Sequence, residues 1–250
     1  MPPTIVIADG PGAVPALAAD LFVAWLAGAI GARGVADVAL TGGSSAGGLY
    51  AALRDPARAG ALDWTRVRAW VGDERFVPLD HPDSNAGLAI RELTDAGAGP
   101  LPRANLHPVP AGATPEAAAA AYAAEIAASV PLHDGVPVLD LVLLGIGGDG
   151  HLLSVFPDSA ALADGAPARG SPGRPAHITP HVARITLTPR ILGVARHVLP
   201  IAAGAGKAAI LARVLDGPED PVALPAQLAR VPHATWLLDP PAAADLRRAG

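Results

Sequence analysis

The segment Gly145-Ile-Gly-Gly-Asp-Gly-His151 places an acidic residue and a histidine shortly after an apolar run, Val138 to Leu144. A histidine can take up and release a proton near neutral pH, which is what a general base must do. Glycines allow the tight backbone turn that would hold the ring at the end of a strand. A lone histidine is more often structural than catalytic, but this setting predicts that His151 is a catalytic base.

The same glycines also resemble a nucleotide-binding loop. Gly145, Gly147 and Gly150 match the dinucleotide fingerprint, which should open a long helix and be followed about 20 residues later by an acidic residue. Here Pro157 cuts the next segment short, and a stretch rich in glycine and proline follows it. We therefore reject a nucleotide site and predict that the protein needs no cofactor.

A second glycine-rich segment, Thr41 to Gly48, reads Thr-Gly-Gly-Ser-Ser-Ala-Gly-Gly and runs into a predicted helix. Free backbone N–H groups at the start of a helix attract phosphate, although a tight turn without a ligand is the alternative. The candidate phosphate contacts are Gly42, Gly43, Ser44 and Ser45.

Ser45 also fits the nucleophile elbow of α/β-hydrolases, because Gly43 and Gly47 flank it at the required spacing. A serine nucleophile would need a later acid and then a histidine. For that histidine, His177, His181, His197 and His233 could each be nominated. The elbow normally follows several strands, whereas Ser45 follows only the second predicted strand, so a serine nucleophile is disfavoured.

Three consecutive charged residues, Asp73, Glu74 and Arg75, follow the apolar run Val67 to Val71, and Asn85 stands at a predicted helix start. Charges beside a buried strand are costly unless they are hydrogen-bonded or bind a ligand. A structural ion network is one explanation. The other is a ligand site, in which the guanidinium group of Arg75 would stabilise an oxyanion or a phosphate.

Two further cations are candidates for holding a phosphate. Arg184 begins a predicted strand, and Lys207 follows Gly204-Ala-Gly206 at a predicted helix start. We expect both at the same edge of the sheet, with surface solvation as the alternative for each. The sequence has neither His-Glu-x-x-His nor a spaced cluster of His and Asp, so we predict no metal site.

Short apolar runs alternate with longer helical patterns, which predicts an α/β fold with a mostly parallel sheet and helices on both faces. In such sheets ligands bind at the carboxyl ends of the strands, where the residues above are concentrated. The predicted strands are Thr4 to Ala8, Val35 to Leu40, Val67 to Val71, Val138 to Leu144, Arg184 to Leu187, Val198 to Ala202 and Thr235 to Leu238. The predicted helices are Val14 to Ile30, Ala46 to Arg54, Asn85 to Leu93, Pro115 to Ser129, Pro189 to Ala195 and Lys207 to Asp216.

Length and composition set the remaining expectations. The chain has 250 residues, of which 51% are hydrophobic, and we expect one domain over 1–250. Its net charge of -5 and the absence of a basic run disfavour nucleic acid as a partner. The absence of cysteine, of a signal peptide and of a long apolar span predicts a cytoplasmic protein that does not bind membranes. Asp164 to Pro175 is expected to form an exposed loop, either a lid or a linker.

Taken together, these motifs resemble the 6-phosphogluconolactonase family. The resemblance rests on LTGGSSAGGLY, VGDERFVPLDHPDSN, LGIGGDGHLLSVFP and RITLTPRIL, followed by a Gly-x-x-Lys helix start and a final TWLLD strand. It implies a three-layer αβα, Rossmann-like fold of the glucosamine-6-phosphate deaminase type. The related deaminases usually carry tyrosine after the Asp-Glu pair and Asn-Gly-His in the later loop, where this chain has Arg75 and Asp149-Gly-His151.

The resemblance implies hydrolysis of 6-phospho-D-glucono-1,5-lactone in the pentose phosphate pathway. In that family His151 would activate water, Asp149 would orient His151, and Arg75 would lie near the substrate. Arg184, Lys207 and the loop from Gly42 to Ser45 would hold the phosphate. Asp73, Asn85 and Gly147 are further candidate substrate contacts. We expect the phosphosugar lactone as the small-molecule partner and a monomer or weak homodimer. The alternatives are a glucosamine-6-phosphate deaminase and a non-catalytic phosphosugar-binding regulator.

Overall fold

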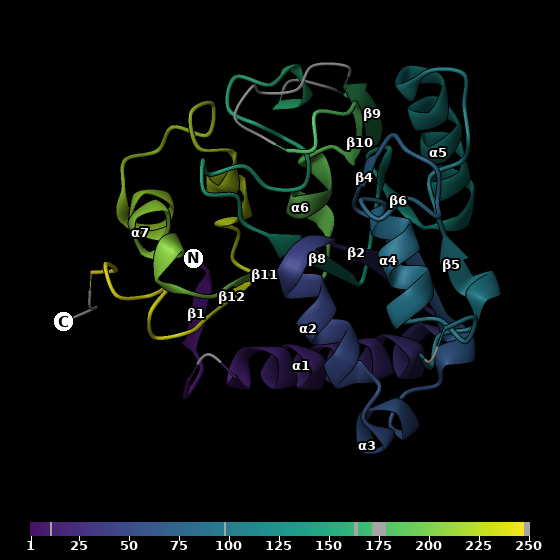
Figure 1. Ribbon diagram of the computed structural model, residues 1–250, viewed down its shortest axis with the longest axis horizontal. Coiled ribbons are helices and arrows are strands. Elements are labelled where there is room, and N and C mark those ends of the chain that lie inside the picture. The colour runs from purple at the N-terminus through teal and green to yellow at the C-terminus, as the bar shows by residue number, and fades with distance from the viewer. Residues whose placement is uncertain (11, 98, 163–164, 172–178, 248–250) are drawn as a thin grey trace.

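A parallel sheet of seven strands forms the centre of the molecule, in the order β1-β12-β11-β8-β2-β3-β5 (Figure 1). The computed structural model describes residues 1–10, 12–97, 99–162, 165–171 and 179–247. The strands are β1 (Thr4–Ile7), β2 (Ala36–Leu40), β3 (Val67–Val71), β5 (Leu106–His107), β8 (Leu141–Gly145), β11 (Val198–Ala202) and β12 (Thr235–Leu238). Strands from both ends of the chain therefore join one sheet.

Helices cover both faces of this sheet, as predicted (Figure 1). The helices are α1 (Ala13–Arg33), α2 (Gly43–Leu53), α3 (Pro56–Gly60), α4 (Asn85–Glu92), α5 (Pro115–Ser129), α6 (Arg190–Val194) and α7 (Ala208–Asp216). Single 3-10 turns lie at Trp64–Arg66, Arg103–Asn105, Ala160–Leu162, Ala205–Lys207 and Pro225–Ala229.

The alternation of side chains along β8 shows why both faces are apolar. Leu141 and Leu143 pack with residues of α1, α2 and α4 in one hydrophobic cluster. Val142 and Leu144 belong to the other cluster, with residues of α5, α6 and α7. Successive side chains of a strand point to opposite faces, so a central strand must be apolar throughout. The three-layer αβα class is thereby confirmed.

A second, smaller sheet corrects one prediction. The segment Arg184–Leu187 is a strand, β10, but it does not belong to the parallel sheet. It pairs antiparallel with β4 (Asp73–Arg75) and β9 (Ala168–Ser171), and α5 packs against this sheet (Figure 1). Leu187 N donates to Gly72 O at 2.8 Å, at the point where the chain leaves β3. The expectation that Arg184 and Lys207 share one sheet edge is therefore wrong.

The predicted loop from Asp164 to Pro175 is also partly wrong. Ala168–Ser171 within it forms β9, whose register pairs Ala168 with Leu187. Strand pairing with β10 overrides the composition of the segment, which is rich in Gly, Pro and Ala. Residues 165–167 belong to no helix or strand, and the rest of the predicted loop, Asp164 and 172–175, lies outside the described residues.

Other boundaries differ by a few residues. Helix α2 begins at Gly43 instead of Ala46, so the glycine-serine segment supplies its first turn. The structure adds β4, β5 and the hairpin of β6 (Leu132–His133) and β7 (Val136–Pro137), which the sequence patterns did not indicate. By length and composition alone α1 could cross a membrane, but in this structure its residues Phe22 and Leu26 are buried in the protein core.

Candidate active site

The segments that follow β2, β3, β8 and β11 meet at the carboxyl edge of the sheet and enclose a pocket of about 200 Å³. This is the location that the predicted topology indicated. We call it the main pocket. Its lining residues are Thr41, Gly42, Gly43, Ser45, Asp73, Arg75, Asn85, Gly145, Ile146, Gly147, His151, Leu153 and Lys207.

His151 and Asp149 form a hydrogen-bonded pair at this pocket. The distance from His151 Nδ1 to Asp149 Oδ1 is 2.5 Å, and the His151 backbone N–H donates to the same oxygen at 3.1 Å. A carboxylate on Nδ1 favours the tautomer with its proton there, which leaves Nε2 as the proton acceptor. The pair therefore has the arrangement of a general base and its orienting acid.

Two neighbours restrict the His151 ring. A Cβ atom at Gly147 would lie 2.0 Å from His151 Nδ1 and 2.6 Å from Asp149 Oδ1, so only glycine fits there. The Phe156 ring packs against the His151 ring, with the two ring centroids 4.7 Å apart. Gly150 adopts a φ of 87°, the left-handed conformation that glycine tolerates best. The turn is thus fitted closely around one ring position.

Asp73 is held by side chains from two other segments. Ser154 Oγ donates to Asp73 Oδ2 at 2.7 Å. Asn85 Nδ2 donates to the Asp73 carbonyl oxygen at 2.7 Å and lies 3.4 Å from its Oδ1. A Cβ at Gly42 would lie 1.8 Å from Asn85 Oδ1, so Gly42 allows the amide to pack against the backbone. This network joins β4, α4 and the loops after β2 and β8.

Glu74 has a structural role instead. Its carboxylate accepts hydrogen bonds from the backbone N–H groups of Arg75, Asn85 and Ala86 at 2.7 to 2.8 Å and from Ser84 Oγ at 3.0 Å. Two of these N–H groups belong to the first turn of α4. Burial raises the pKa of Glu74, and the hydrogen bonds oppose that shift. Two explanations were considered for the consecutive charges Asp73, Glu74 and Arg75, namely a structural network and a ligand site. The structural explanation applies to Glu74.

Arg75 and Arg184 lie at an adjoining pocket of about 290 Å³. The two residues are directly opposite in the antiparallel register of β4 and β10, where like charges repel. Arg184 is 3% exposed, and within the described structure its Nη1 is buried without a hydrogen-bond partner. Burial lowers the pKa of Arg184, and the neighbouring Arg75 adds to this effect. An anion in this pocket would relieve both costs.

Lys207 supplies a cation to the main pocket. It ends the 3-10 turn before α7, and its Nζ donates to the Ile146 carbonyl oxygen at 2.7 Å. This contact ties the ammonium group to the segment that carries His151. The two pockets share Asp73, Arg75, His151 and Leu153, so their contents would lie next to each other.

Leu153 lines both pockets and has an uncommon backbone conformation. Its φ is 52°, which a bulky residue rarely adopts, and its side chain is buried. A Cβ at Gly72 would lie 3.0 Å from Leu153 Cδ2 and 2.8 Å from the Leu40 carbonyl oxygen. Backbone strain of this kind collects at functional sites.

The structure brings most of the predicted site residues together. Those in the main pocket are Gly42, Gly43, Ser45, Asp73, Arg75, Asn85, Gly147, His151 and Lys207. Asp149 is hydrogen-bonded to His151, and Arg184 lines the adjoining pocket. The side chain of Ser44 lies outside the described part of the structure.

Several lining residues were missed by the sequence reasoning, namely Thr41, Gly145, Ile146, Leu153, Ser154, Phe156 and Thr179. Ser154 and Phe156 belong to the motif LGIGGDGHLLSVFP, and Thr41 begins the glycine-serine segment, so their positions carried a signal. Nothing in the sequence indicated the contribution of Thr179.

In the described residues no group of three His, Asp or Glu is placed to hold a metal ion, and the absence of a metal requirement stays a prediction.

The geometry also bears on the two rejected alternatives. Ser45 shares the main pocket with His151, whereas His197 lines a different pocket and His233 Nε2 contacts the Leu192 carbonyl oxygen. His177 lies outside the described residues. Gly145 is followed by turns and short bridges instead of the long helix of a dinucleotide loop.

Comparison with known proteins agrees with this geometry. The sequence profile described as glucosamine-6-phosphate isomerases/6-phosphogluconolactonase matches residues 11–237. The 6-phosphogluconolactonase of Streptomyces coelicolor is 41% identical over 225 residues, covering 86% of this chain and 84% of the relative. That of Synechocystis is 38% identical over 228 residues, covering 88% of each chain.

A solved structure gives the same result. The 6-phosphogluconolactonase from Trypanosoma brucei superposes with a TM-score of 0.84 at 28% identity, covering 98% of this chain and 99% of the other. The predicted resemblance is thereby confirmed. The chain belongs to the family of glucosamine-6-phosphate isomerases and 6-phosphogluconolactonases.

Proposed function

We propose that this protein hydrolyses 6-phospho-D-glucono-1,5-lactone to 6-phospho-D-gluconate. The observation that carries the proposal is the His151–Asp149 pair, which opens into a pocket that also holds Arg75 and Lys207. The names of the relatives agree with this reaction. A lactone is an activated ester, so a base and charge stabilisation suffice and no covalent nucleophile is required.

In the proposed mechanism Nε2 of His151 accepts a proton from a water molecule as the water oxygen bonds to the lactone carbonyl carbon. The proton on Nδ1 stays hydrogen-bonded to Asp149, which stabilises the imidazolium that forms. The bond between the carbonyl carbon and the ring oxygen then breaks. His151 returns its proton to the departing ring oxygen, so the enzyme ends in its starting state.

The phosphate group would be held by cations on two sides. Among the described residues the buried Nη1 of Arg184 has no hydrogen-bond partner, so it has the free donor that a phosphate oxygen needs. Lys207, Gly42 and Gly43 line the main pocket and could add an ammonium group and backbone N–H groups. Binding energy gained at the phosphate orients the lactone ring toward His151. The same phosphate contacts are made in the ground state and in the transition state, so the loss of one cation is expected mainly to raise KM.

The test is a coupled assay on freshly generated 6-phosphoglucono-δ-lactone, corrected for spontaneous hydrolysis. We expect turnover by the wild type and a drop in kcat of about 100-fold or more in His151→Ala. Lys207→Ala should mainly raise KM. His133→Ala is the matched control, because His133 lies in the exposed β6 hairpin and should behave as wild type.

Near-normal kcat in His151→Ala would refute the mechanism. Glucosamine 6-phosphate should be assayed in parallel, because its turnover without lactone turnover would favour the deaminase alternative. Absence of turnover with both substrates, combined with phosphosugar binding, would favour a regulator. A cytoplasmic location and a monomeric or weakly dimeric state are part of the same proposal.

A further inference from the structure

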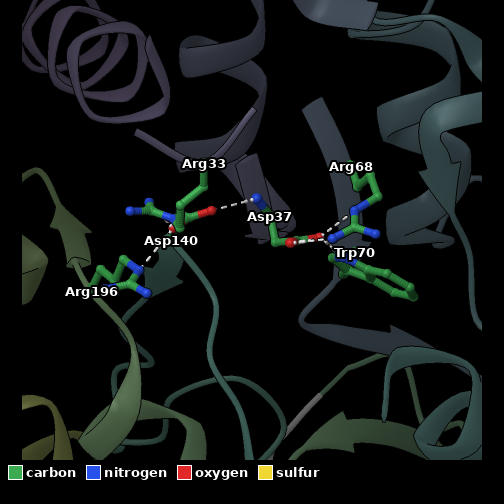
Figure 2. A network of polar contacts seen from close by, with 6 residues as sticks. All are labelled: Arg33, Asp37, Arg68, Trp70, Asp140 and Arg196. Atoms are coloured by element: carbon green, nitrogen blue, oxygen red, sulfur yellow. Dashed lines mark hydrogen bonds and ion pairs between the residues drawn. The ribbon is translucent and has the colours of Figure 1, made fainter. Parts of the chain in front are cut away.

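A second polar cluster lies at the amino edge of the parallel sheet, opposite the main pocket. Asp140, which directly precedes β8, accepts a hydrogen bond from Arg33 Nη2 at 2.6 Å and pairs with Arg196 Nε at 3.2 Å (Figure 2). Its other oxygen accepts from the Asp37 backbone N–H at 2.8 Å. The Asp140 side chain is buried, whereas both arginines are partly exposed. One carboxylate therefore orients two cations.

The charges of this cluster do not balance. Asp37 already has its own partner, because Arg68 donates to both of its carboxylate oxygens at 2.8 and 2.6 Å, and Trp70 Nε1 donates at 3.0 Å (Figure 2). Arg33, Arg68 and Arg196 thus face Asp37 and Asp140, which leaves one excess positive charge. The chain as a whole carries a net charge of -5. A local excess of guanidinium groups on such a protein favours an anion from solution.

A pocket of about 230 Å³ is lined by two of these arginines, Arg33 and Arg196. Its wall includes Trp25 and His197, whose rings stack with centroids 4.4 Å apart and planes 4° apart. The helix α1 contributes small residues to the lining, and a Cβ built at Gly28 meets nothing within 4 Å. The pocket therefore combines two oriented guanidinium groups, a flat aromatic wall and space for a small group.

We propose that this amino-edge pocket, lined by Ala24, Trp25, Gly28, Ala29, Arg33, Asp140, Arg196 and His197, binds a small molecule through an oxyanion, a phosphate or carboxylate group. Arg33 and Arg196 donate the N–H groups that Asp140 does not use, and Asp140 keeps both guanidinium groups in position. The stacked rings of Trp25 and His197 give the rest of the ligand an aromatic surface to contact. This site is separate from the main pocket and does not depend on the proposed reaction.

Inorganic phosphate is the probe for the test. It is titrated into the full-length protein at constant pH and ionic strength, and the NMR signals of the His197 ring and the Trp25 indole are followed. We expect a saturable change in both signals. Site-resolved signals separate this event from phosphate binding in the main pocket.

Three variants locate the binding. Arg196→Gln should weaken it about tenfold or more, because a charge-assisted hydrogen bond is lost while Asp140 keeps Arg33. Gly28→Leu should also weaken it, by filling the pocket without changing its charge. Arg54→Gln is the matched control, because Arg54 forms an exposed ion pair with Glu92 outside the pocket. It should bind as wild type.

The proposal is wrong if phosphate causes no saturable change in the wild type, or if sodium chloride causes the same change. It is also wrong if both Arg196→Gln and Gly28→Leu respond as the wild type does. Because the two variants act by charge and by volume, the proposal stays testable even if one of them fails to fold.

Discussion

Gly147 shows how closely the sequence around His151 is fitted to one ring position. A methyl group there would collide with His151 Nδ1 and with Asp149 Oδ1, whereas a Cβ at the next residue, Gly148, meets nothing within 4 Å. The two glycines are adjacent in sequence but differ completely in surroundings. They therefore provide a matched pair for testing whether the position of the ring controls the reaction.

We expect Gly147→Ala to lower kcat about 100-fold, because displacing a catalytic group by about 1 Å can cost that much. Gly148→Ala should keep at least half of the wild-type rate. Both are measured in the lactonase assay, with circular dichroism as a check on the fold. Equal activity of the two variants would show that the contact seen at Gly147 does not constrain the base.

Arg184 is expected to lower the stability of the free protein while it contributes to substrate binding. Replacing it with methionine removes a buried guanidinium nitrogen that has no partner among the described residues, and it also removes the repulsion from Arg75. Arg184→Met should therefore raise the free energy of unfolding without substrate by about 1 kcal/mol, since apolar replacements of buried charges are often stabilising. It should also raise KM for the phosphorylated lactone about tenfold or more.

Urea unfolding and steady-state kinetics on the same preparations check both effects. Arg54→Met is the control, because Arg54 is exposed and paired with Glu92 on the surface. An unchanged KM in Arg184→Met would mean that the free donor does not bind the substrate.

The residue types of the site were predictable from the sequence, but their individual tasks were only partly so. Glycines beside an acid and a histidine at a strand end indicated His151 correctly as a pocket residue. Asp73 and Glu74 are chemically alike and adjacent, yet Asp73 lines the pocket while Glu74 caps a helix. Successive residues of a strand point in opposite directions, and the sequence does not say which direction faces the ligand.

At the scale of the elements, Glu74 connects β4 to the start of α4. Its buried carboxylate accepts N–H groups that a helix start leaves without internal partners. Glu74→Gln should lower the free energy of unfolding by about 1 to 3 kcal/mol, because the amide nitrogen cannot accept those bonds. Urea denaturation measures this, and Glu92→Gln, on the half-exposed face of α4, should stay within about 0.5 kcal/mol of wild type.

The long helices and the apolar central strands were predictable from the sequence. Short strands that depend on a neighbouring strand, such as β9, were not. The apolar runs of β2, β3, β8 and β11 appear in the sequence because both faces of a central strand are buried. β9 has four residues, including glycine, and exists because β10 lies beside it. β10 is the next strand along the chain but is separated from β9 by residues 172–183, and the local composition of β9 carries no record of this partner.

At the scale of the whole molecule, opposite edges of the sheet hold different polar groups. Asp140 at the amino edge links α1, β2 and the segment before β11, whereas His151 lies at the carboxyl edge. Asp140→Asn should lower the free energy of unfolding by about 2 to 3 kcal/mol, because it leaves Arg33 and Arg196 poorly paired. Its kcat should remain within about twofold of wild type, since the variant's fold keeps the distant site intact.

This separation is checked by measuring urea unfolding and lactonase kinetics on the same variant. A large loss of kcat in folded Asp140→Asn protein would show that the amino edge also shapes the catalytic loop.

His197 at the same edge should make stability depend on pH. Burial, followed by the nearby His233, lowers the pKa of His197, with Arg196 acting in the same direction and Asp140 opposing it. A lowered histidine pKa means that its contribution to stability is complete above about pH 6.5 and is lost as the pH falls through the folded-state value. His197→Gln should weaken the decline in unfolding free energy between about pH 7 and about pH 5.

Urea titrations across this range measure the slope, and His133→Gln, on the exposed β6 hairpin, is the control. An identical slope in wild type and His197→Gln would show that His197 does not contribute to the acid sensitivity.

The order of strands in the central sheet has a consequence for synthesis on the ribosome. β1 pairs with β12, which spans Thr235–Leu238 and is synthesised long after β1. β12 in turn lies between β1 and β11, so β1 has no partner in the central sheet until β12 has emerged from the ribosome. The backbone edge of β1 that pairs with β12 therefore stays unpaired throughout that interval, and a chain truncated before residue 235 would leave it unpaired permanently.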